Sequence, residues 1–97
     1  MNYGIEIKET AREGSAEAFL YYEEQQFGLG NRFLDKLELL LHEIAKHPKL
    51  YQQKYKQFRQ AQIKPFPYLI IFEIDGMVVV VHKVINAVRH PKRRYKK

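Results

Sequence analysis

Cysteine is absent from this chain, and its absence excludes several kinds of chemistry. Without a thiol there is no disulfide, no cysteine ligand for zinc and no cysteine nucleophile. A chain without disulfides fits a reducing compartment, so we expect a cytoplasmic location.

Long apolar runs are absent too. No run approaches the roughly 20 residues that span a bilayer, and residues 1–9 lack the apolar core of a signal peptide. We therefore expect no membrane partner. His42, His47 and His82 show no metal-ligand spacing with one another or with a carboxylate, so we expect neither a metal nor a cofactor.

Acidic residues are scarce in the second half of the chain. Residues 1–43 hold 9 Asp or Glu against 4 Lys or Arg, a net charge of −5. Residues 44–97 hold 2 Asp or Glu against 13 Lys or Arg, a net charge of +11. A positive field concentrated in one region steers anions toward it, so the sequence favours an anionic partner such as nucleic acid.

The 97 residues are enough for one domain with a modest core. At 45% hydrophobic and 13% aromatic residues, the composition is typical of an ordered globular protein. We expect a single domain over residues 1–97. It ends in a basic tail at residues 89–97, where six of the nine residues are Lys or Arg.

Hydrophobic periodicity predicts one strand and two helices in the first half. Alternating apolar residues predict a strand over residues 3–7, and a helix follows over residues 10–26 with Thr10 as N-cap and Glu13 as its capping-box partner. A second helix over residues 31–47 ends before a proline. Its apolar stripe comprises Phe33, Leu34, Leu37, Leu40, Leu41 and Ile44. Because the link is short, we expect an antiparallel helical hairpin.

The second half reads as strands. Residues 49–56 predict a polar loop, and residues 57–64 predict a strand. Two β-rich apolar runs at 68–74 and 77–85 flank an Asp-Gly pair, a strong hairpin signal because glycine supplies the positive φ of a tight primed turn. The order is therefore β-α-α-β-β-β. We expect an α+β fold in which the helical hairpin packs on one face of a mainly antiparallel sheet.

Several ordered motifs cover nearly the whole chain. They are AFLYYEEQQFGLGNRFLDKL, the segment Pro48–Tyr51, Arg59, FPYLIIFEIDG and VVVVHKVINAVRHP. Together they resemble the toxins of the RelE/ParE superfamily from bacterial type II toxin–antitoxin modules, and the FPY form is more similar to the ParE branch. The resemblance implies a growth-arresting toxin of a plasmid-stabilisation type of system, neutralised by a cognate antitoxin.

The resemblance leaves two targets open. A ParE-like toxin poisons DNA gyrase without hydrolysing nucleic acid, and this is the interpretation we favour, since no carboxylate or histidine base stands in register for catalysis. A RelE-like toxin cleaves mRNA on the ribosome, and in that case the resemblance implies Arg59, Arg89 and Tyr95 as catalytic residues. A third interpretation is a non-toxic nucleic-acid or protein-binding module that keeps the fold. Whether the chain is an enzyme stays open.

Basic residues of the second half are the candidate contacts to an anionic target. We expect Arg59 and Arg89 to share a cationic surface on one sheet that grips phosphate through bidentate geometry. The alternative is solvated surface arginines and, for the tail, a frayed solubilising end. The full set of candidates for target or nucleic-acid binding is Lys54, Lys56, Arg59, Lys64, Arg89, His90, Arg93 and Arg94.

Aromatic residues gather in the first helix and the link after it. Tyr21 points away from Tyr22 on a helix, so part of the cluster is expected to reach the surface. By the resemblance, the antitoxin would bind a patch that includes Tyr21, Tyr22 and Phe27, or else the groove between the helical hairpin and the sheet. The alternative is that these aromatics belong mostly to the core, because single exposed aromatics need no explanation.

Overall fold

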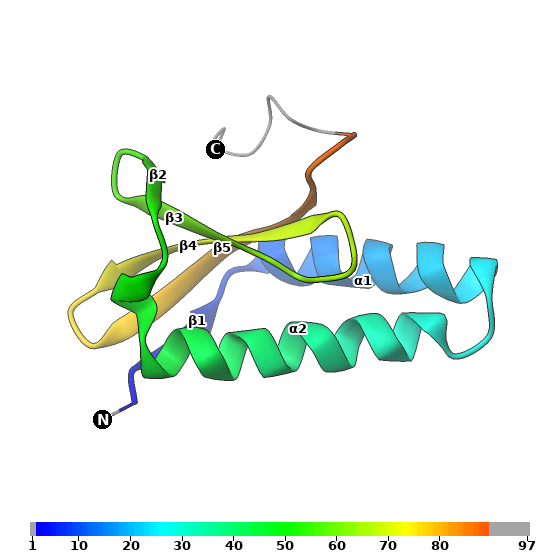
Figure 1. Ribbon diagram of the computed structural model, residues 1–97, viewed down its shortest axis with the longest axis horizontal. Coiled ribbons are helices and arrows are strands. Elements are labelled where there is room, and N and C mark those ends of the chain that lie inside the picture. The colour runs from blue at the N-terminus through cyan, green and yellow to red at the C-terminus, as the bar shows by residue number, and fades with distance from the viewer. Residues whose placement is uncertain (1, 90–97) are drawn as a thin grey trace.

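A computed structural model describes residues 2–89 of the chain. Two antiparallel helices form one layer and a twisted five-stranded sheet forms the other (Figure 1). The expected α+β class and the helical hairpin on one face of the sheet are confirmed. The elements are β1 (Gly4–Ile7), α1 (Glu9–Gln25), α2 (Leu29–Lys46), the short 3₁₀ turn η1 (Pro48–Leu50), β2 (Gln53–Tyr55), β3 (Phe58–Gln62), β4 (Tyr68–Asp75) and β5 (Val78–Asn86).

The strands lie in the order β1-β5-β4-β3-β2. Strand β1 runs parallel to β5, and every other neighbouring pair is antiparallel. A parallel pair needs a crossover connection, and the helical hairpin that follows β1 in the chain crosses one face of the sheet in this way. The valine-rich strand β5 lies between β1 and β4, and a continuous β-branched run suits such a central strand.

The hairpin of β4 and β5 turns at Gly76, as the Asp-Gly signal predicts. Asp75 pairs with Val78, and Gly76 has φ +61° at the first central position of the two-residue turn, the position that is glycine in a type II′ turn. Further along, Ile71 pairs with Lys83 while Phe72 pairs with Val81. The residue between them, His82, is the extra residue of a β-bulge.

Helix α1 packs on β5 through a stripe of small residues. Ala11 and Ala18 are fully buried, and Gly14 lies between them on the same face. A methyl group added at Gly14 would lie 2.1 Å from the carbonyl oxygen of Val84, so only glycine allows this approach. This close packing sets the distance between α1 and β5.

Helix α2 supplies bulky side chains instead. Phe33, Leu37 and Ile44 are buried, which confirms the apolar stripe predicted for this helix. Its other members, Leu34, Leu40 and Leu41, are partly buried against the same core. The core of the fold therefore fills the space between the helical layer and one face of the sheet.

Two sequence predictions about local structure are wrong. Thr10 is not the N-cap of α1, because β1 pairing continues through a bond from Lys8 N to Val81 O and the helix starts at the next residue. The carbonyl of Lys8 accepts the first helical bonds, so the capping box with Glu13 does not form. Residues 49–56 are also not a plain loop, since they contain η1 and the short edge strand β2.

The turn between the helices is held by a carboxylate. Oxygens of Glu23 accept hydrogen bonds from Gly28 N at 2.9 Å and Gly30 N at 3.0 Å. Gly28 has φ +86°, a conformation that favours glycine, and precedes the first residue of α2. A negative charge at a helix N-terminus is stabilising. Glu23 therefore stabilises both the start of α2 and the turn that joins the two helices.

Candidate functional site

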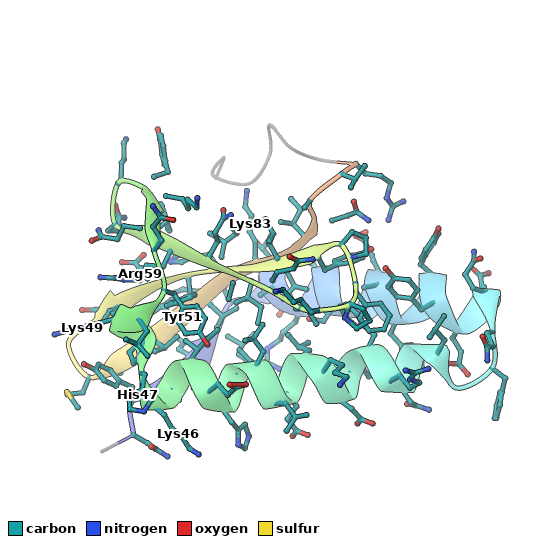
Figure 2. The ribbon with its side chains drawn as sticks, in the orientation of Figure 1. Lys46, His47, Lys49, Tyr51, Arg59 and Lys83 are labelled. Atoms are coloured by element: carbon teal, nitrogen blue, oxygen red, sulfur yellow. The ribbon has the colours of Figure 1, made fainter. Side chains whose placement is uncertain are left out.

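Arg59 holds the segment that follows α2. Its Nη1 donates to Tyr51 O at 2.7 Å and to Lys49 O at 3.5 Å, and its Nη2 donates to Gln53 Oε1 at 3.5 Å. Figure 2 shows the Arg59 side chain beside Lys49 and Tyr51. Much of the donor capacity of this guanidinium is therefore used by the chain itself.

We call the hydrogen bonds of Arg59 to residues 49–53 the Arg59 clamp. Several exposed lysines lie near it. Lys49, Lys54 and Lys56 are exposed, and Lys46 lies at the end of α2 nearby (Figure 2). Lys56 has φ +52° in the β2–β3 turn, and Gln53 Nε2 donates to its carbonyl at 3.1 Å. We call Lys46, Lys49, Lys54 and Lys56 the basic end. No acidic residue lies between Glu43 and Glu73, so nothing in this part of the sequence offsets the charge.

Arg89 is fixed at a different place. Asn86 Oδ1 accepts its backbone N–H at 2.8 Å, and its Nη2 donates to the Tyr68 hydroxyl at 3.2 Å. The guanidinium carbon lies 5.2 Å from the ring centroid of Tyr21, a cation–π arrangement. Arg89 therefore joins the end of β5 to α1.

The shared cationic surface expected for the two arginines is not what the structure shows. Arg59 pairs with Phe72, whereas Arg89 contacts Tyr68, four residues earlier on β4, which is about 13 Å along a strand. Arg59 also lies on β3 and turns toward the segment after α2, while Arg89 turns toward α1. Lys64 is exposed beyond the other end of β3 from Lys56. The predicted basic residues thus occupy separate regions.

The sheet face opposite the helices has an apolar centre. Phe58, Leu69 and Ile71 are buried together, with Ile85 and Ala87 packed against them. Lys83 pairs with Ile71 and lies on this face, and burial lowers the pKa of its ammonium below the usual value for lysine. Figure 2 shows Lys83 on the side of the sheet away from the helices.

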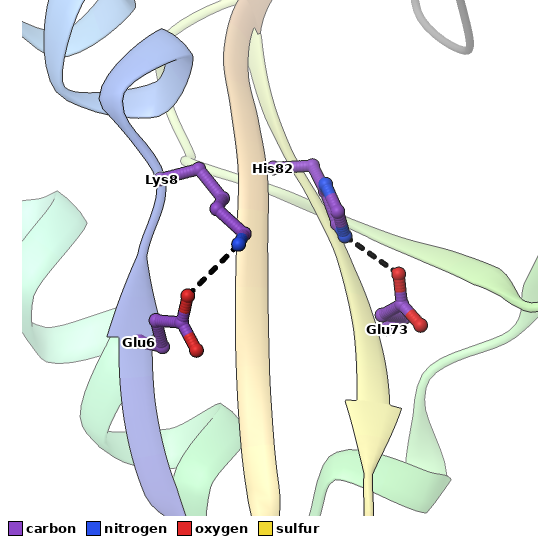
Figure 3. A network of polar contacts seen from close by, with 4 residues as sticks. All are labelled: Glu6, Lys8, Glu73 and His82. Carbon is purple, nitrogen blue, oxygen red and sulfur yellow. Dashed lines mark hydrogen bonds and ion pairs between the residues drawn. The ribbon is translucent and has the colours of Figure 1, made fainter. Parts of the chain in front are cut away.

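A histidine–carboxylate pair lies beside this apolar centre. His82 Nε2 is 2.6 Å from Glu73 Oε2, and the imidazole ring contacts Phe58 edge-on at 5.2 Å between centroids. Glu6 on the neighbouring strand β1 and Lys8, which follows that strand, form a second pair at 2.9 Å (Figure 3). No pattern in the sequence assigns His82 a role, because the bulge that brings its ring within 2.6 Å of the Glu73 carboxylate leaves no mark in a period-two pattern.

The three residues expected at the antitoxin interface differ in exposure. Phe27 is 94% exposed and Tyr21 is 44% exposed, but Tyr22 is only 9% exposed. Tyr22 packs against Phe33 and Phe66, and burial raises the pKa of its phenol. Tyr22 is therefore a core residue, and of the three only Tyr21 and Phe27 offer surface to a partner.

The remaining predicted site residues, His90, Arg93, Arg94 and Tyr95, lie outside the described residues. Within residues 2–89 no group of three His, Asp or Glu side chains is placed to hold a metal ion. Neither described helix has the length and apolarity to cross a membrane.

Comparison with known proteins gives the family. The family model described as "ParE toxin of type II toxin-antitoxin system, parDE" matches residues 5–95. Among solved structures, the fold is similar to the chromosomal ParDE toxin–antitoxin system from P. aeruginosa, with TM-score 0.78, 7% identity and coverage of 87% of this chain and 95% of that one. It is also similar to the E. coli DinJ–YafQ toxin–antitoxin complex, with TM-score 0.60, 14% identity and coverage of 91% and 96%. No curated protein matches the sequence. Since the family model spans almost the whole chain, the chain belongs to the ParE toxin family.

Proposed function

We propose that this chain is the toxin of a type II toxin–antitoxin pair, which arrests growth when free and is neutralised by a cognate antitoxin. Its membership of the ParE family over residues 5–95 carries the proposal. A pair of this kind encoded on a plasmid would stabilise that plasmid.

The target that we propose is DNA gyrase, poisoned without hydrolysis of nucleic acid. Two observations favour this over an endonuclease. Much of the donor capacity of Arg59, one of the arginines that an endonuclease would use, is taken by Tyr51 O, Lys49 O and Gln53 Oε1 of its own chain. Arg59 and Arg89 also lie at separate places in the sheet, so the pair does not converge on one scissile phosphate.

The basic end is the surface that we assign to the target. It combines exposed lysines with a rigid support, because Arg59 anchors the segment that carries Lys49 and Lys54. Gyrase works on DNA, whose phosphates attract such a cluster and make binding sensitive to salt. Residues 90–97 carry five further cations, which are candidates for the same contact.

The test is induced expression without antitoxin, read out in three ways in the same culture. We expect growth arrest, a DNA-damage response and intact mRNA by primer extension. With purified gyrase, ATP and supercoiled plasmid, the protein should increase the linear DNA released by denaturing the enzyme. Cleaved mRNA without DNA damage would reject gyrase as the target. Absence of any arrest would instead point to the non-toxic binding module.

A matched set of variants tests the surface. Lys54→Gln combined with Lys56→Gln removes two exposed charges from the β2–β3 turn, and we expect less linear DNA at equal protein concentration. Arg32→Gln combined with Lys36→Gln removes two exposed charges from α2 and serves as control. Equal loss in both variants would mean that net charge alone matters, and no loss in either would exclude the basic end.

A ribosome-dependent mRNA endonuclease is the second candidate, and one observation favours it. An imidazole oriented by a carboxylate is a common general base, and His82 is held in this way by Glu73 on the face that also carries Lys83. Such a base would activate the ribose 2′-hydroxyl for attack on the adjacent phosphate. His82→Gln keeps a hydrogen-bonding side chain beside Glu73 but cannot transfer the proton. Under this alternative His82→Gln abolishes mRNA cleavage, and under the gyrase proposal it leaves DNA damage intact.

A further inference from the structure

A polar cavity lies where α1 meets the end of β5. Its volume is about 320 Å³, near the lower end of ligand pockets, which span roughly 300–1,000 Å³. One wall is the α1 face that carries Thr10, Glu13 and Glu17, and the other is formed by the end of β5, by Arg89 after it and by Tyr68 at the start of β4. Gly14 and Val84 also line the cavity, at the point where α1 and β5 approach each other most closely.

Asn86 lines this cavity with an amide donor that has no acceptor among residues 2–89. The residue is only 8% exposed. Its Oδ1 accepts hydrogen bonds from Val88 N at 2.9 Å and Arg89 N at 2.8 Å, and because a backbone N–H can only donate, these bonds fix which end of the carboxamide is oxygen. Among residues 2–89, the Nδ2 of Asn86 donates to no acceptor. Buried amides are rarely left unsatisfied, so this nitrogen points to a ligand that accepts.

Tyr68 and Arg89 bring further donors to the same cavity. The Tyr68 hydroxyl accepts from Arg89 Nη2 at 3.2 Å, and within the described chain no acceptor takes its own proton. The Arg89 guanidinium is held by this bond and by the Tyr21 ring, which leaves further N–H groups for a ligand. Donors from Asn86, Tyr68 and Arg89 together match an anionic acceptor with two oxygens, such as a carboxylate.

The opposite wall decides which anion fits. Glu13 and Glu17 are one helical turn apart on the same face of α1. They repel a polyanion such as a nucleic-acid strand, whose phosphates follow one another along the backbone. A peptide can complement the charges on both sides of the cavity. One acidic side chain can face Arg89 while a neighbouring Lys or Arg faces the two glutamates.

We propose that this cavity anchors the antitoxin by binding one acidic side chain between Arg89, Asn86 Nδ2 and the Tyr68 hydroxyl, with an adjoining basic residue on Glu13 and Glu17. The proposal rests on the proposed toxin–antitoxin function and adds the site and the chemistry of the partner. It gives Arg89 a role in partner binding, apart from the basic end.

Asn86→Asp is the discriminating change. The new carboxylate still accepts the backbone N–H groups of Val88 and Arg89, so the local turn is kept. The donor nitrogen becomes an acceptor oxygen, which repels a bound carboxylate. We expect the affinity for the antitoxin encoded beside the gene to fall about 10- to 100-fold, the range for losing one hydrogen bond to a charged group. Asn31→Asp makes the same chemical change at an exposed position of α2 and should leave the affinity unchanged.

The measurement is calorimetric titration of the antitoxin into each full-length variant, with circular dichroism to confirm folding. If Asn86→Asp does not fold, Arg89→Gln at an exposed position provides the same test. In double-mutant cycles, each acidic residue of the antitoxin is changed to Gln and combined with Asn86→Asp. We expect the two changes to affect the binding free energy non-additively at one acidic position only. Equal affinity of wild type and Asn86→Asp for the antitoxin overturns the anchor and leaves the toxin function standing.

A second experiment tests the cavity independently of the proposed toxin–antitoxin function. The dipeptide N-acetyl-Glu-Lys amide and inorganic phosphate are each titrated into ¹⁵N-labelled wild-type chain, and the Asn86 side-chain amide signal is followed. We expect the dipeptide to shift this signal and phosphate to shift it less. If no antitoxin binds the wild type, the proposed function fails, and this titration still decides whether the cavity takes a carboxylate. An equal or larger shift with phosphate would overturn the choice of a peptide.

Discussion

Gly14→Ala tests the close packing of α1 on β5, from which the cavity and the core geometry both follow. Alanine is normally the better residue inside a helix, by about 1 kcal/mol over glycine. At this position its methyl group would lie 2.1 Å from Val84 O and 3.2 Å from Val84 C. Ordinary contact begins at 3.4 Å, so α1 must rise by about 1.3 Å or the strand must yield.

The expected cost can be worked from these distances. Overpacking a well-filled interior costs typically about 1–3 kcal/mol, and the upper end applies here because the obstacle is backbone, not the tip of a flexible side chain. Subtracting the gain of about 1 kcal/mol in helix propensity leaves a net destabilisation of roughly 2 kcal/mol. For a chain of this size, that lowers the melting temperature by about 8–16 °C.

The assay is thermal and urea unfolding followed by circular dichroism. Gly4→Ala is the matched control, because its added methyl group meets only atoms at 3.8 and 3.9 Å. We expect the control to change stability by less than about 1 kcal/mol. Replacing an ordinary helical glycine by alanine raises the melting temperature. The same increase for Gly14→Ala would refute the close packing of α1 against the Val84 backbone.

Three further predictions concern the core, the clamp and the response to pH. Leu37→Asp places a charge at a site that is 8% exposed and should cost at least about 3 kcal/mol, so a cooperative urea transition like that of wild type would show that α2 does not face the sheet. Arg59→Ala removes the donors to Tyr51 O and Lys49 O, so hydrogen exchange in residues 49–55 should speed up relative to an Arg32→Ala control, and unchanged exchange would mean that the clamp is not formed in solution. Burial, followed by the neighbouring Tyr68 and Tyr21, raises the folded-state pKa of Tyr22 above 10.0. The folded state then holds more protons than the unfolded state above pH 10, so the free energy of unfolding falls as pH rises from 9 to 11. Tyr22→Phe should show a smaller fall between urea titrations at those two pH values, and an identical fall would exclude Tyr22 as a source.

Much of the fold was predictable because periodic patterns report which face of an element is buried. The stripe from Phe33 to Ile44 can only be the inner face of a helix, and the two apolar runs around Gly76 can only be paired strands. These signals are local, since each depends on residues within a few positions of one another. They sufficed for the α+β class and for the helical hairpin on one face of the sheet.

Helix starts were harder to predict, because they depend on pairing elsewhere. Thr10 has the right chemistry for a cap, but the bond between Lys8 N and Val81 O links residues far apart in the chain and starts the helix earlier. The edge strand β2 was missed for the same reason. It is short and exposed, and it forms by pairing with β3, not by a hydrophobic pattern of its own.

The sequence by itself determined which residues carry charge and that the second half of the chain is strongly basic. Only the tertiary structure decided what those charges touch. Arg59 and Arg89 look alike in the sequence, yet one binds the segment after α2 and the other joins Tyr68 to Tyr21. The bulge at His82 likewise appears only once β4 and β5 are paired, and the Asn86 Nδ2 group, which has no acceptor among residues 2–89, faces the cavity only once α1 is packed against them. The physical reason is that a side chain's partners are set by through-space distances, which sequence separation does not encode.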